Sequence, residues 1–174
     1  GEAKAGGNYA GSLLAGKLAR DKGCSQVLWL DAKERKYVEE VGAMNIWFAF
    51  GNTLVTPPLE GTILPGVTRD ALLELAPTLG YEIEERQITI DEIWAGANDG
   101  SLTEAFGCGT AAVISPVGRL VTDDDSVEIH GNSVGPVAKR LYNELTDLQH
   151  GRKPDPFGWV RTIGTKEQAA TTPQ

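Results

Sequence analysis

The sequence predicts an α+β fold in which helices lie outside a mixed sheet. Short apolar or alternating segments typical of strands, such as residues 26–30 and 45–50, are interspersed with stretches of helical periodicity. The Gly51-Asn52 dipeptide between two extended segments predicts a hairpin. Because strands and helices are interleaved irregularly, a mixed sheet is favoured over a regular βαβ series.

The first third of the chain is expected to contain one helix and several strands. Residues 8–23 have helical spacing and end at Gly23, which can adopt a left-handed cap. Residues 26–30 predict a short strand, the polar residues 31–36 a turn, and Tyr37 the start of a second extended segment. The apolar stripe expected on the first helix consists of Tyr9, Leu13, Leu14 and Leu18.

Proline and glycine residues interrupt regular structure between residues 57 and 66, and a second helix is predicted over residues 67–79. Pro77 should kink or shorten its last turn. Residues 81–90 alternate strongly between apolar and polar and predict a half-exposed strand. Asp91 is expected to cap a short helix that ends near Ala97.

The last third is expected to contain two strands, over residues 102–106 and 111–117, on either side of a glycine-rich turn. Residues 118–127 predict a turn with an acidic loop; the spacing of its three aspartates does not match an EF-hand. A final helix is predicted over residues 134–148, and residues 162–174 resemble a disordered tail in composition.

Composition excludes several classes of protein. The 174 residues suit one domain, and the net charge of −8 argues against a nucleic-acid-binding surface. The sequence has neither an apolar run of membrane-spanning length nor the layout of a signal peptide. Cys24 and Cys108 are far apart and lack metal-ligand spacing, which suits a reducing compartment. We therefore expect a cytoplasmic protein.

A lysine near the start of the chain has unusually small neighbours. Lys4 lies among alanine and glycine residues, and Tyr9 follows five positions later. Such bare surroundings leave room for a planar ligand, but they also suit a glycine-rich chain end with an incidental lysine. The chain has no initiator methionine, and a functional lysine needs packed structure on both sides. These two observations suggest a piece of a longer protein.

Three further segments carry groups that could share one ligand with this lysine. Glu39 and Glu40 run into a turn of small residues, Pro65-Gly66 precedes a helix whose N-terminus could bind a phosphate, and residues 109–111 form a second bare turn. A reactive lysine, a carboxylate, a phosphate-binding helix end and a threonine are the parts of a pyridoxal phosphate site. The prediction rests on their conjunction.

At these segments the sequence resembles the C-terminal, cofactor-binding domain of the branched-chain-amino-acid aminotransferases, which are class IV, fold type IV pyridoxal phosphate enzymes. The resemblance implies the large domain of that fold, a mixed-sheet pseudo-barrel with flanking helices, over residues 1–160. Residues 161–174 then remain as the tail that is expected to be disordered. The matching segments are KAGGNYAGSLLA (4–15), QVLWLD (26–31), EEVGAMNIWF (39–48), TPPLEGTILPGVTR (56–69) and EAFGCGTAAVISPVG (104–118).

The resemblance also implies a role for each matching residue. Lys4 matches the lysine that holds the cofactor covalently and moves the proton during the reaction. Glu40 matches the carboxylate on the pyridine nitrogen, which leaves Glu39 more exposed, and Tyr9 matches the tyrosine on the ring oxygen beside the substrate. Further matches are Leu64, Val67, Thr68 and Thr110 at the phosphate, and Ala43, Thr110 and Ala111 at the substrate.

The implied activity is transamination of leucine, isoleucine or valine with 2-oxoglutarate, in a homodimer or larger assembly. The family's N-terminal domain, which supplies much of the substrate pocket, is absent from this sequence. The redox CxxC found after the GTA turn in mammalian members is also absent, and Cys108 is expected to be a small packed residue. A D-amino-acid aminotransferase, an aminodeoxychorismate lyase and an inactive structural module are the alternatives.

Overall fold

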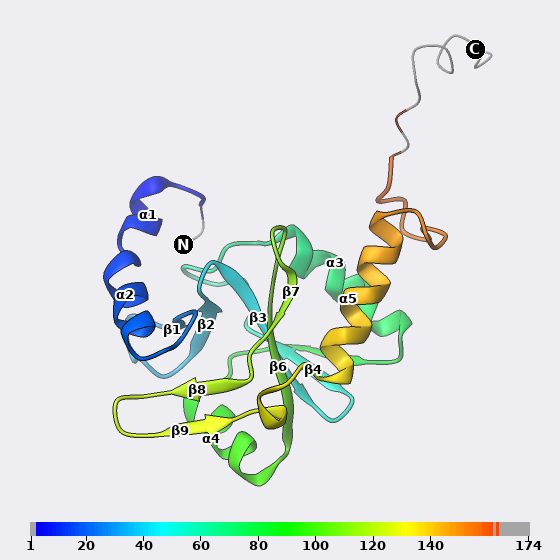
Figure 1. The fold of residues 1–174 in the computed structure, drawn as a ribbon. Coiled ribbons are helices and arrows are strands. Elements are labelled where there is room, and N and C mark those ends of the chain that lie inside the picture. The colour runs from blue at the N-terminus through cyan, green and yellow to red at the C-terminus, as the bar shows by residue number, and fades with distance from the viewer. Residues whose placement is uncertain (1–2, 162, 164–174) are drawn as a thin grey trace, which may run out of the picture. The chain divides into compact units, whose positions relative to one another are not determined.

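The computed structural model describes residues 3–161 and residue 163 (Figure 1). The chain divides into two compact units, Gly1–Tyr142 and Asn143–Gln174. All of the strands in the described residues belong to the first unit. Most of the tail that was predicted to be disordered lies outside the described residues.

The first unit is built around β3 (Met44–Phe50), which has three neighbours in the sheet. β6 (Leu102–Gly109) pairs with it antiparallel from one end to the other. β2 (Val38–Val41) and β4 (Thr53–Thr56) both pair with its opposite edge, β2 near the start of β3 and β4 near its end. The hairpin of β3 and β4 turns at Gly51-Asn52, as predicted.

Three more strands extend this sheet within the described residues, which gives it seven strands in all. β1 lies antiparallel to β2, β7 lies antiparallel to β6, and β5 lies parallel to β4. This mixture confirms the predicted α+β class, and in the described residues the sheet stays open. The added strands are β1 (Leu28–Leu30), β5 (Glu82–Glu85) and β7 (Val113–Pro116).

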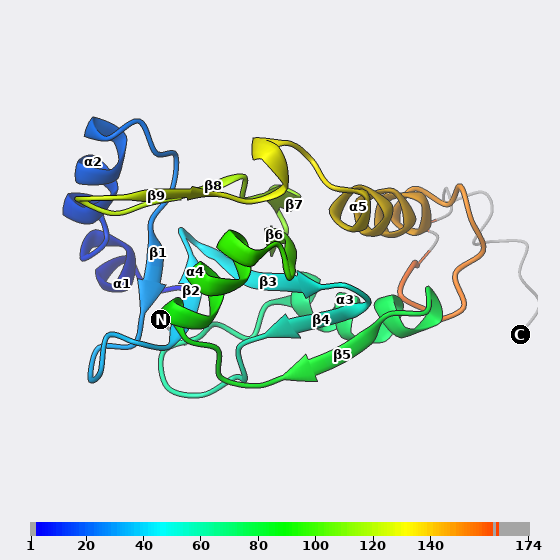
Figure 2. The same cartoon turned by 90° about the horizontal axis from the view of Figure 1, so that it is seen from below.

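β3 is buried along nearly its whole length because both faces of the sheet are covered. On one face Ile46 and Phe48 join an apolar cluster that includes Ile93 of α4 (Ile90–Asp99). On the other face Trp47 lies opposite Phe106 of β6, with their rings stacked 6.5 Å apart. A continuous apolar sequence is typical of a strand with no solvent-facing side. Figure 2 shows α4 lying against the sheet, beside β6.

The predicted first helix is wrong in two respects. It is interrupted, giving α1 (Gly6–Ala10) and α2 (Leu13–Asp21), and neither helix contains a buried residue. The interruption falls at Gly11 and Ser12, where the Ser12 hydroxyl donates to the Tyr9 carbonyl at 2.7 Å. Glycine is a poor helix former, and serine side chains compete for backbone groups. The predicted apolar stripe is exposed, by 42% at Tyr9, 70% at Leu13 and Leu14, and 56% at Leu18.

Two other regions also differ from the prediction. The strand expected over residues 81–90 ends at Glu85, and Thr89, not Asp91, caps α4 by accepting a hydrogen bond from the amide of Glu92 at 3.1 Å. Residues expected to form a single turn instead form a hairpin, whose tip carries the predicted acidic loop. Short polar strands lack the alternation that identifies strands in a sequence. The hairpin consists of β8 (Arg119–Val121) and β9 (Ser126–Glu128).

Of the other two long helices, α5 begins where the sheet provides a partner for its free amides. α3 spans Val67–Thr78, with Pro77 in its last turn, and α5 spans Pro136–Gln149. The first turn of α5 donates to the carboxylate of Glu104 on β6, from Val137 at 2.8 Å and Ala138 at 2.9 Å. A carboxylate at a helix N-terminus satisfies unpaired donors and complements the helix dipole. Glu104 is 3% exposed, so water cannot replace it.

Replacing Glu104 should therefore destabilise the fold strongly. We expect Glu104→Ala to lower the free energy of unfolding by about 3 kcal/mol, because it leaves two buried amides without acceptors. Urea unfolding followed by circular dichroism measures the change. The control is Glu128→Ala, at an exposed position on β9, which should change stability by less than about 0.5 kcal/mol. Equal losses in the two variants would show that α5 does not depend on Glu104.

Candidate functional site

The candidate site lies where the sheet splits along one edge of β3. β2 is paired with β3 as far as Asn45, and β4 begins to pair only at Phe48. Backbone groups of β3 between these points need other partners. The Thr56 hydroxyl donates to the Ile46 carbonyl at 2.8 Å, and Leu64 approaches the same region.

Leu64 is held in this split through both of its backbone groups. Its amide donates to Oε1 of Glu40 at 3.2 Å, and its carbonyl accepts from Nδ2 of Asn45 at 2.8 Å. Nδ2 of Asn45 also lies 3.4 Å from Oε1 of Glu40, which faces it directly across the β2–β3 pair. The three groups form a closed set of contacts that fixes a loop against two strands.

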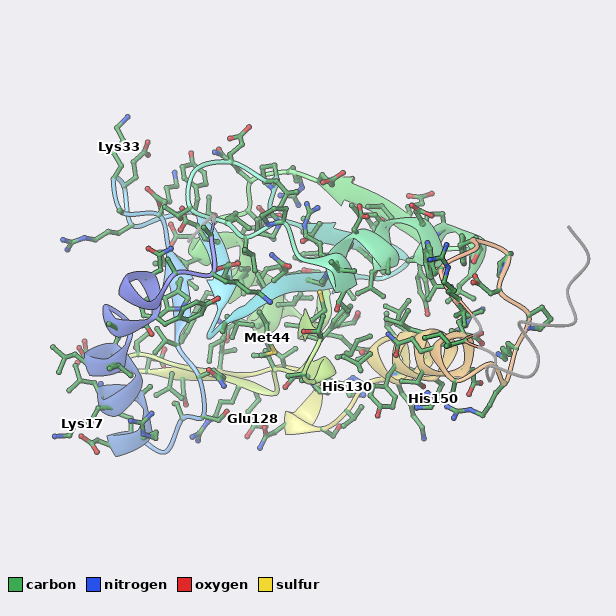
Figure 3. The ribbon with its side chains drawn as sticks, turned by 90° about the horizontal axis from the view of Figure 1, so that it is seen from above. Lys17, Lys33, Met44, Glu128, His130 and His150 are labelled. Atoms are coloured by element: carbon green, nitrogen blue, oxygen red, sulfur yellow. The ribbon has the colours of Figure 1, made fainter. Side chains whose placement is uncertain are left out.

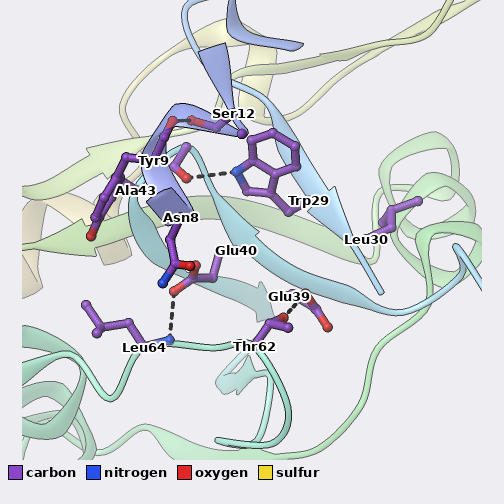
Figure 4. A pocket seen from close by; sticks show the side chains of 12 residues that line it. Asn8, Tyr9, Ser12, Trp29, Leu30, Glu39, Glu40, Ala43, Thr62 and Leu64 are labelled. Atoms are coloured by element: carbon purple, nitrogen blue, oxygen red, sulfur yellow. Dashed lines mark hydrogen bonds between the residues drawn. The ribbon is translucent and has the colours of Figure 1, made fainter. Parts of the chain in front are cut away.

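A pocket of about 270 Å³ opens beside these residues (Figure 4). It brings together four of the predicted site residues, Tyr9, Glu40, Ala43 and Leu64. The remaining lining combines small residues with polar and aromatic groups, so a flat ring could lie close to the backbone. These other lining residues are Asn8, Gly11, Ser12, Trp29, Leu30, Glu39, Gly42 and Thr62.

The turn at the base of the pocket is held by Trp29. Its indole Nε1 donates to the carbonyl of Gly42 at 2.8 Å. Gly42 has a φ of 59°, in the left-handed region that favours glycine. No sequence signal indicated this role, because a tryptophan in a short apolar strand is also typical of a core.

Met44 follows this turn and points into the interior, whereas Lys17 and Lys33 point outward (Figure 3).

Glu40 is the pocket residue with the clearest electrostatic perturbation. Its side chain is half-buried, and this burial raises the pKa of its carboxyl group. The amide of Leu64 opposes the shift, and the neighbouring carboxylate of Glu39 adds to it. Glu39 is also half-buried, and it accepts a hydrogen bond from the Thr62 hydroxyl at 2.5 Å. The two carboxylates thus point toward different partners.

The start of α3 lies a few residues beyond Leu64. Among the described residues no side chain caps this helix, whose N-cap is Gly66. Uncapped amides and the helix dipole make such a terminus suitable for an anion. Val67 is 75% exposed and Thr68 is buried; neither contributes to the lining of the pocket.

The turn between β6 and β7 lies at the same end of the sheet. Asn45 of β3 pairs with Cys108 of β6, so Thr110 follows β6 at the end where the Ala43 turn precedes β3. Thr110 and Ala111 are exposed and do not line the pocket. Val113, which closes the turn, has a φ of 58°. A β-branched residue rarely adopts this conformation, so the turn is strained.

Lys4 is exposed and does not line the pocket. Its segment leads into α1, which contributes Asn8 and Tyr9 to the lining. Asn45 contacts both Glu40 and Leu64, although it was not among the predicted site residues. A polar residue at the start of an otherwise apolar strand was the available signal.

Other kinds of site find no support in the described part of the chain. It contains no group of three or more histidine, cysteine, aspartate or glutamate side chains that could hold a metal ion. None of its helices is both long and apolar enough to cross a membrane. Burial raises the pKa of the Cys108 thiol to about 12, in keeping with the packed residue that was predicted.

Comparison with known proteins identifies the family. Residues 2–120 match the family described as amino-transferase class IV. This match covers more than half of the chain, and the chain therefore belongs to the class IV aminotransferase family. The resemblance inferred from five sequence segments is confirmed.

Within this family, the chain is similar to individual proteins named branched-chain-amino-acid aminotransferases. The chain is 52% identical over 163 residues to a probable branched-chain-amino-acid aminotransferase of Streptomyces coelicolor, a match that covers 94% of this chain and 45% of the relative. The branched-chain amino acid aminotransferase structure from Escherichia coli superimposes with a TM-score of 0.79 at 34% identity, over 94% of this chain and 51% of the other.

A third match was solved with a ligand. The T.th. branched-chain amino acid aminotransferase, complexed with N-(5'-phosphopyridoxyl)-L-glutamate, has a TM-score of 0.76 at 34% identity and covers 91% of this chain and 49% of the other. The chain thus spans about half the length of the relatives that it matches. These neighbours share the fold type IV architecture that was predicted.

The raised pKa of Glu40 predicts a pH-dependent effect on stability. Below the unfolded pKa the carboxyl group is neutral in both states and imposes no penalty. As the pH rises through the unfolded value toward the raised folded value, ionisation favours the unfolded chain. Glu40→Gln removes this ionisation and keeps an oxygen that can accept from Leu64. Relative to this variant, the wild-type free energy of unfolding should fall as the pH rises from acid to neutral.

Urea unfolding at a series of pH values measures this difference. The matched control for the substitution itself is Glu60→Gln, which makes the same change at an exposed loop position. A difference between the wild type and Glu40→Gln that does not vary with pH would contradict the assignment of a raised pKa to Glu40.

Proposed function

We propose that this chain is the cofactor-binding part of a pyridoxal 5'-phosphate-dependent aminotransferase that acts on branched-chain L-amino acids with 2-oxoglutarate. The observation that carries the proposal is the pocket, which places the Glu40 carboxylate beside the turn leading to the uncapped start of α3. A cation-binding carboxylate and an anion-binding helix end suit a ligand with a protonated ring at one end and a phosphate at the other.

The residues present fit such a ligand. Glu40 can accept from a protonated ring nitrogen, and the turn that Leu64 begins leads to the backbone amides of Val67 and Thr68, which can donate to a phosphate. Gly42 and Ala43 leave space for a flat ring, and the Tyr9 hydroxyl can reach a polar ring substituent. Thr110 and Ala111 offer a hydroxyl and turn amides at the same end of the sheet, for a phosphate and a substrate carboxylate.

Bound pyridoxal phosphate supplies an electron-withdrawing ring that stabilises negative charge at the substrate Cα. In this proposal the chain's own residues move the proton and keep the ring charged. Lys4, as a neutral amine, accepts the proton from the substrate Cα and later returns a proton on the cofactor side. Glu40 stays ionised beside the cationic ring, because an opposite charge offsets the effect of burial on its pKa.

The choice of substrates rests on the relatives and on the sequence. The S. coelicolor relative and both structural neighbours carry branched-chain-amino-acid aminotransferase names. The GAMN, ILPGVTR and GTAAV segments also favour this group over a D-amino-acid aminotransferase or an aminodeoxychorismate lyase. We further propose that the missing half of the relatives' length completes the substrate pocket, and that the complete protein is a cytoplasmic homodimer or larger assembly. Cys24 and Cys108 are both free, in keeping with that compartment.

Labelling at Lys4 tests the cofactor assignment. Incubation of the protein with pyridoxal phosphate, reduction with borohydride and peptide mapping by mass spectrometry should place a pyridoxyl group on Lys4. Lys4→Ala should abolish this label, whereas Lys17→Ala, which changes an exposed lysine on α2, should retain it. A label that persists in Lys4→Ala, or that is lost equally in Lys17→Ala, would reject Lys4 as the cofactor lysine.

A substrate panel tests the reaction. In a protein of full family length that carries this chain, L-leucine, L-isoleucine and L-valine should each give a 2-oxo acid with 2-oxoglutarate as acceptor. D-alanine should react at least about a hundredfold more slowly, because the wrong hand directs the Cα proton away from the base. Faster turnover of D-alanine would favour the D-amino-acid alternative, and no turnover of any amino acid would favour the lyase or a structural module.

A further inference from the structure

Asn45 is a buried polar residue, 5% exposed, in a strand that is otherwise apolar. Both hydrogens of its amide nitrogen have acceptors within reach, the Leu64 carbonyl at 2.8 Å and the Glu40 carboxylate at 3.4 Å. Burial of an amide is costly unless its hydrogen bonds are made. Asn45 is therefore placed for these contacts and not for packing alone.

We propose that Asn45 is a positioning residue that holds the Glu40 carboxylate and the turn before α3 at a fixed separation. This inference rests on the proposed function, in which these two groups bind opposite ends of one cofactor. Asn45 itself does not line the pocket, so it acts through Glu40 and Leu64.

The geometry requires an amide at this position. A carboxylate would place acceptors against the Leu64 carbonyl and Glu40, and an apolar side chain of similar size would leave that carbonyl without its donor. The two contacts of the Asn45 amide also differ in strength. The 2.8 Å bond to Leu64 anchors the turn, whereas the 3.4 Å contact with Glu40 is weak and serves to orient the carboxylate.

Gly66 provides independent support. Its φ of −77° is open to any residue, so conformation alone does not explain a glycine there. A Cβ added to Gly66 would overlap Oδ1 of Asn45. The turn can therefore come this close to β3 only if it has no side chain at this position. Two residues that are far apart in the sequence thus specify one close contact.

The consequence concerns ligands that span both ends of the site. Loss of the Asn45 amide should let the turn shift relative to β2, and it should remove a donor from Glu40. A ligand that touches one end can follow the group that it binds. A ligand that touches both ends needs the two groups at one separation, so it should lose more affinity than the two single-ended ligands lose together.

The test compares Asn45→Ala and Gly66→Ala with a matched control, Asn52→Ala, in a protein of full family length that carries this chain. Nδ2 of Asn52 donates to the Gly80 carbonyl at 2.7 Å. This is also a hydrogen bond from an asparagine amide to a backbone carbonyl, but it does not involve Glu40 or Leu64. The first measurement is the titration of the Glu40 carboxyl carbon by nuclear magnetic resonance in cofactor-free protein. The second is the dissociation constant of each of three probes, pyridoxal 5'-phosphate, pyridoxal and inorganic phosphate.

We expect Asn45→Ala and Gly66→Ala to raise the pKa of Glu40 further and to weaken pyridoxal 5'-phosphate binding about tenfold or more, as is common when a supporting group is removed. The combined losses for pyridoxal and phosphate should be smaller than this loss. Asn52→Ala should match the wild type in every measurement. If Asn45→Ala does not fold, Asn45→Asp replaces it and should weaken binding more at neutral than at acid pH, because a protonated aspartate regains a donor.

The proposal is overturned if the Glu40 titration is unchanged in the Asn45 variants, or if their affinity for pyridoxal 5'-phosphate falls no more than in Asn52→Ala. It is also overturned if all three probes weaken by the same factor, which would indicate a general loss of structure. If the wild type binds no pyridoxal 5'-phosphate but the Glu40 titration shifts in the Asn45 variants, the positioning contact stands and the proposed cofactor is rejected.

Discussion

The structure depends on one constraint. Two strands, β2 and β4, pair with different parts of the same edge of β3, and a gap remains between them. β2 and β4 leave a stretch of β3 around Ile46 without a strand partner on that edge. A buried backbone carbonyl without a hydrogen bond is costly. The fold solves this locally, with the Thr56 hydroxyl on the Ile46 carbonyl and with the Leu64 segment placed alongside. The split is thereby filled by ordered polar contacts, beside which the candidate pocket lies.

The same solution accounts for the polar side chains that lie in the pocket and directly behind it. Side chains that satisfy backbone groups in a split sheet must themselves be polar and held in place, and Glu40 and Asn45 meet both conditions. Because these groups are half-buried or buried, their charges and hydrogen bonds are less screened than at an open surface. A site of this kind is preorganised before any ligand arrives.

The N-terminal backbone amides of α3 and α5 differ in whether the protein provides them with a partner. α5 begins against the Glu104 carboxylate of β6, which is a partner within the protein. α3 begins at Gly66, where no described side chain provides a cap. Helix N-termini attract negative charge in either case. The difference is that the donors of α5 are already satisfied, whereas those of α3 remain for an anion, which agrees with the phosphate site proposed at α3.

The sequence alone determined the features that depend on neighbouring residues. The hairpin at Gly51-Asn52 and the helix that starts at Val67 follow from local composition and spacing, which also drew attention to the Glu39-Glu40 pair. The choice of Glu40 within that pair came from the family resemblance. Family segments added the expected roles of Lys4 and Thr110, which remain predictions because the structure places both outside the pocket lining.

Only the tertiary structure decided which distant groups meet. The contacts of Leu64 with Glu40 and Asn45 join residues that are 24 and 19 positions apart, and no local pattern encodes such a pair. The interruption at Gly11 and Ser12 and the β8–β9 hairpin were missed for a related reason, since weak propensities are settled by competing hydrogen bonds and not by periodicity. Local sequence specifies the elements, whereas the need to satisfy buried polar groups after they pack specifies the site.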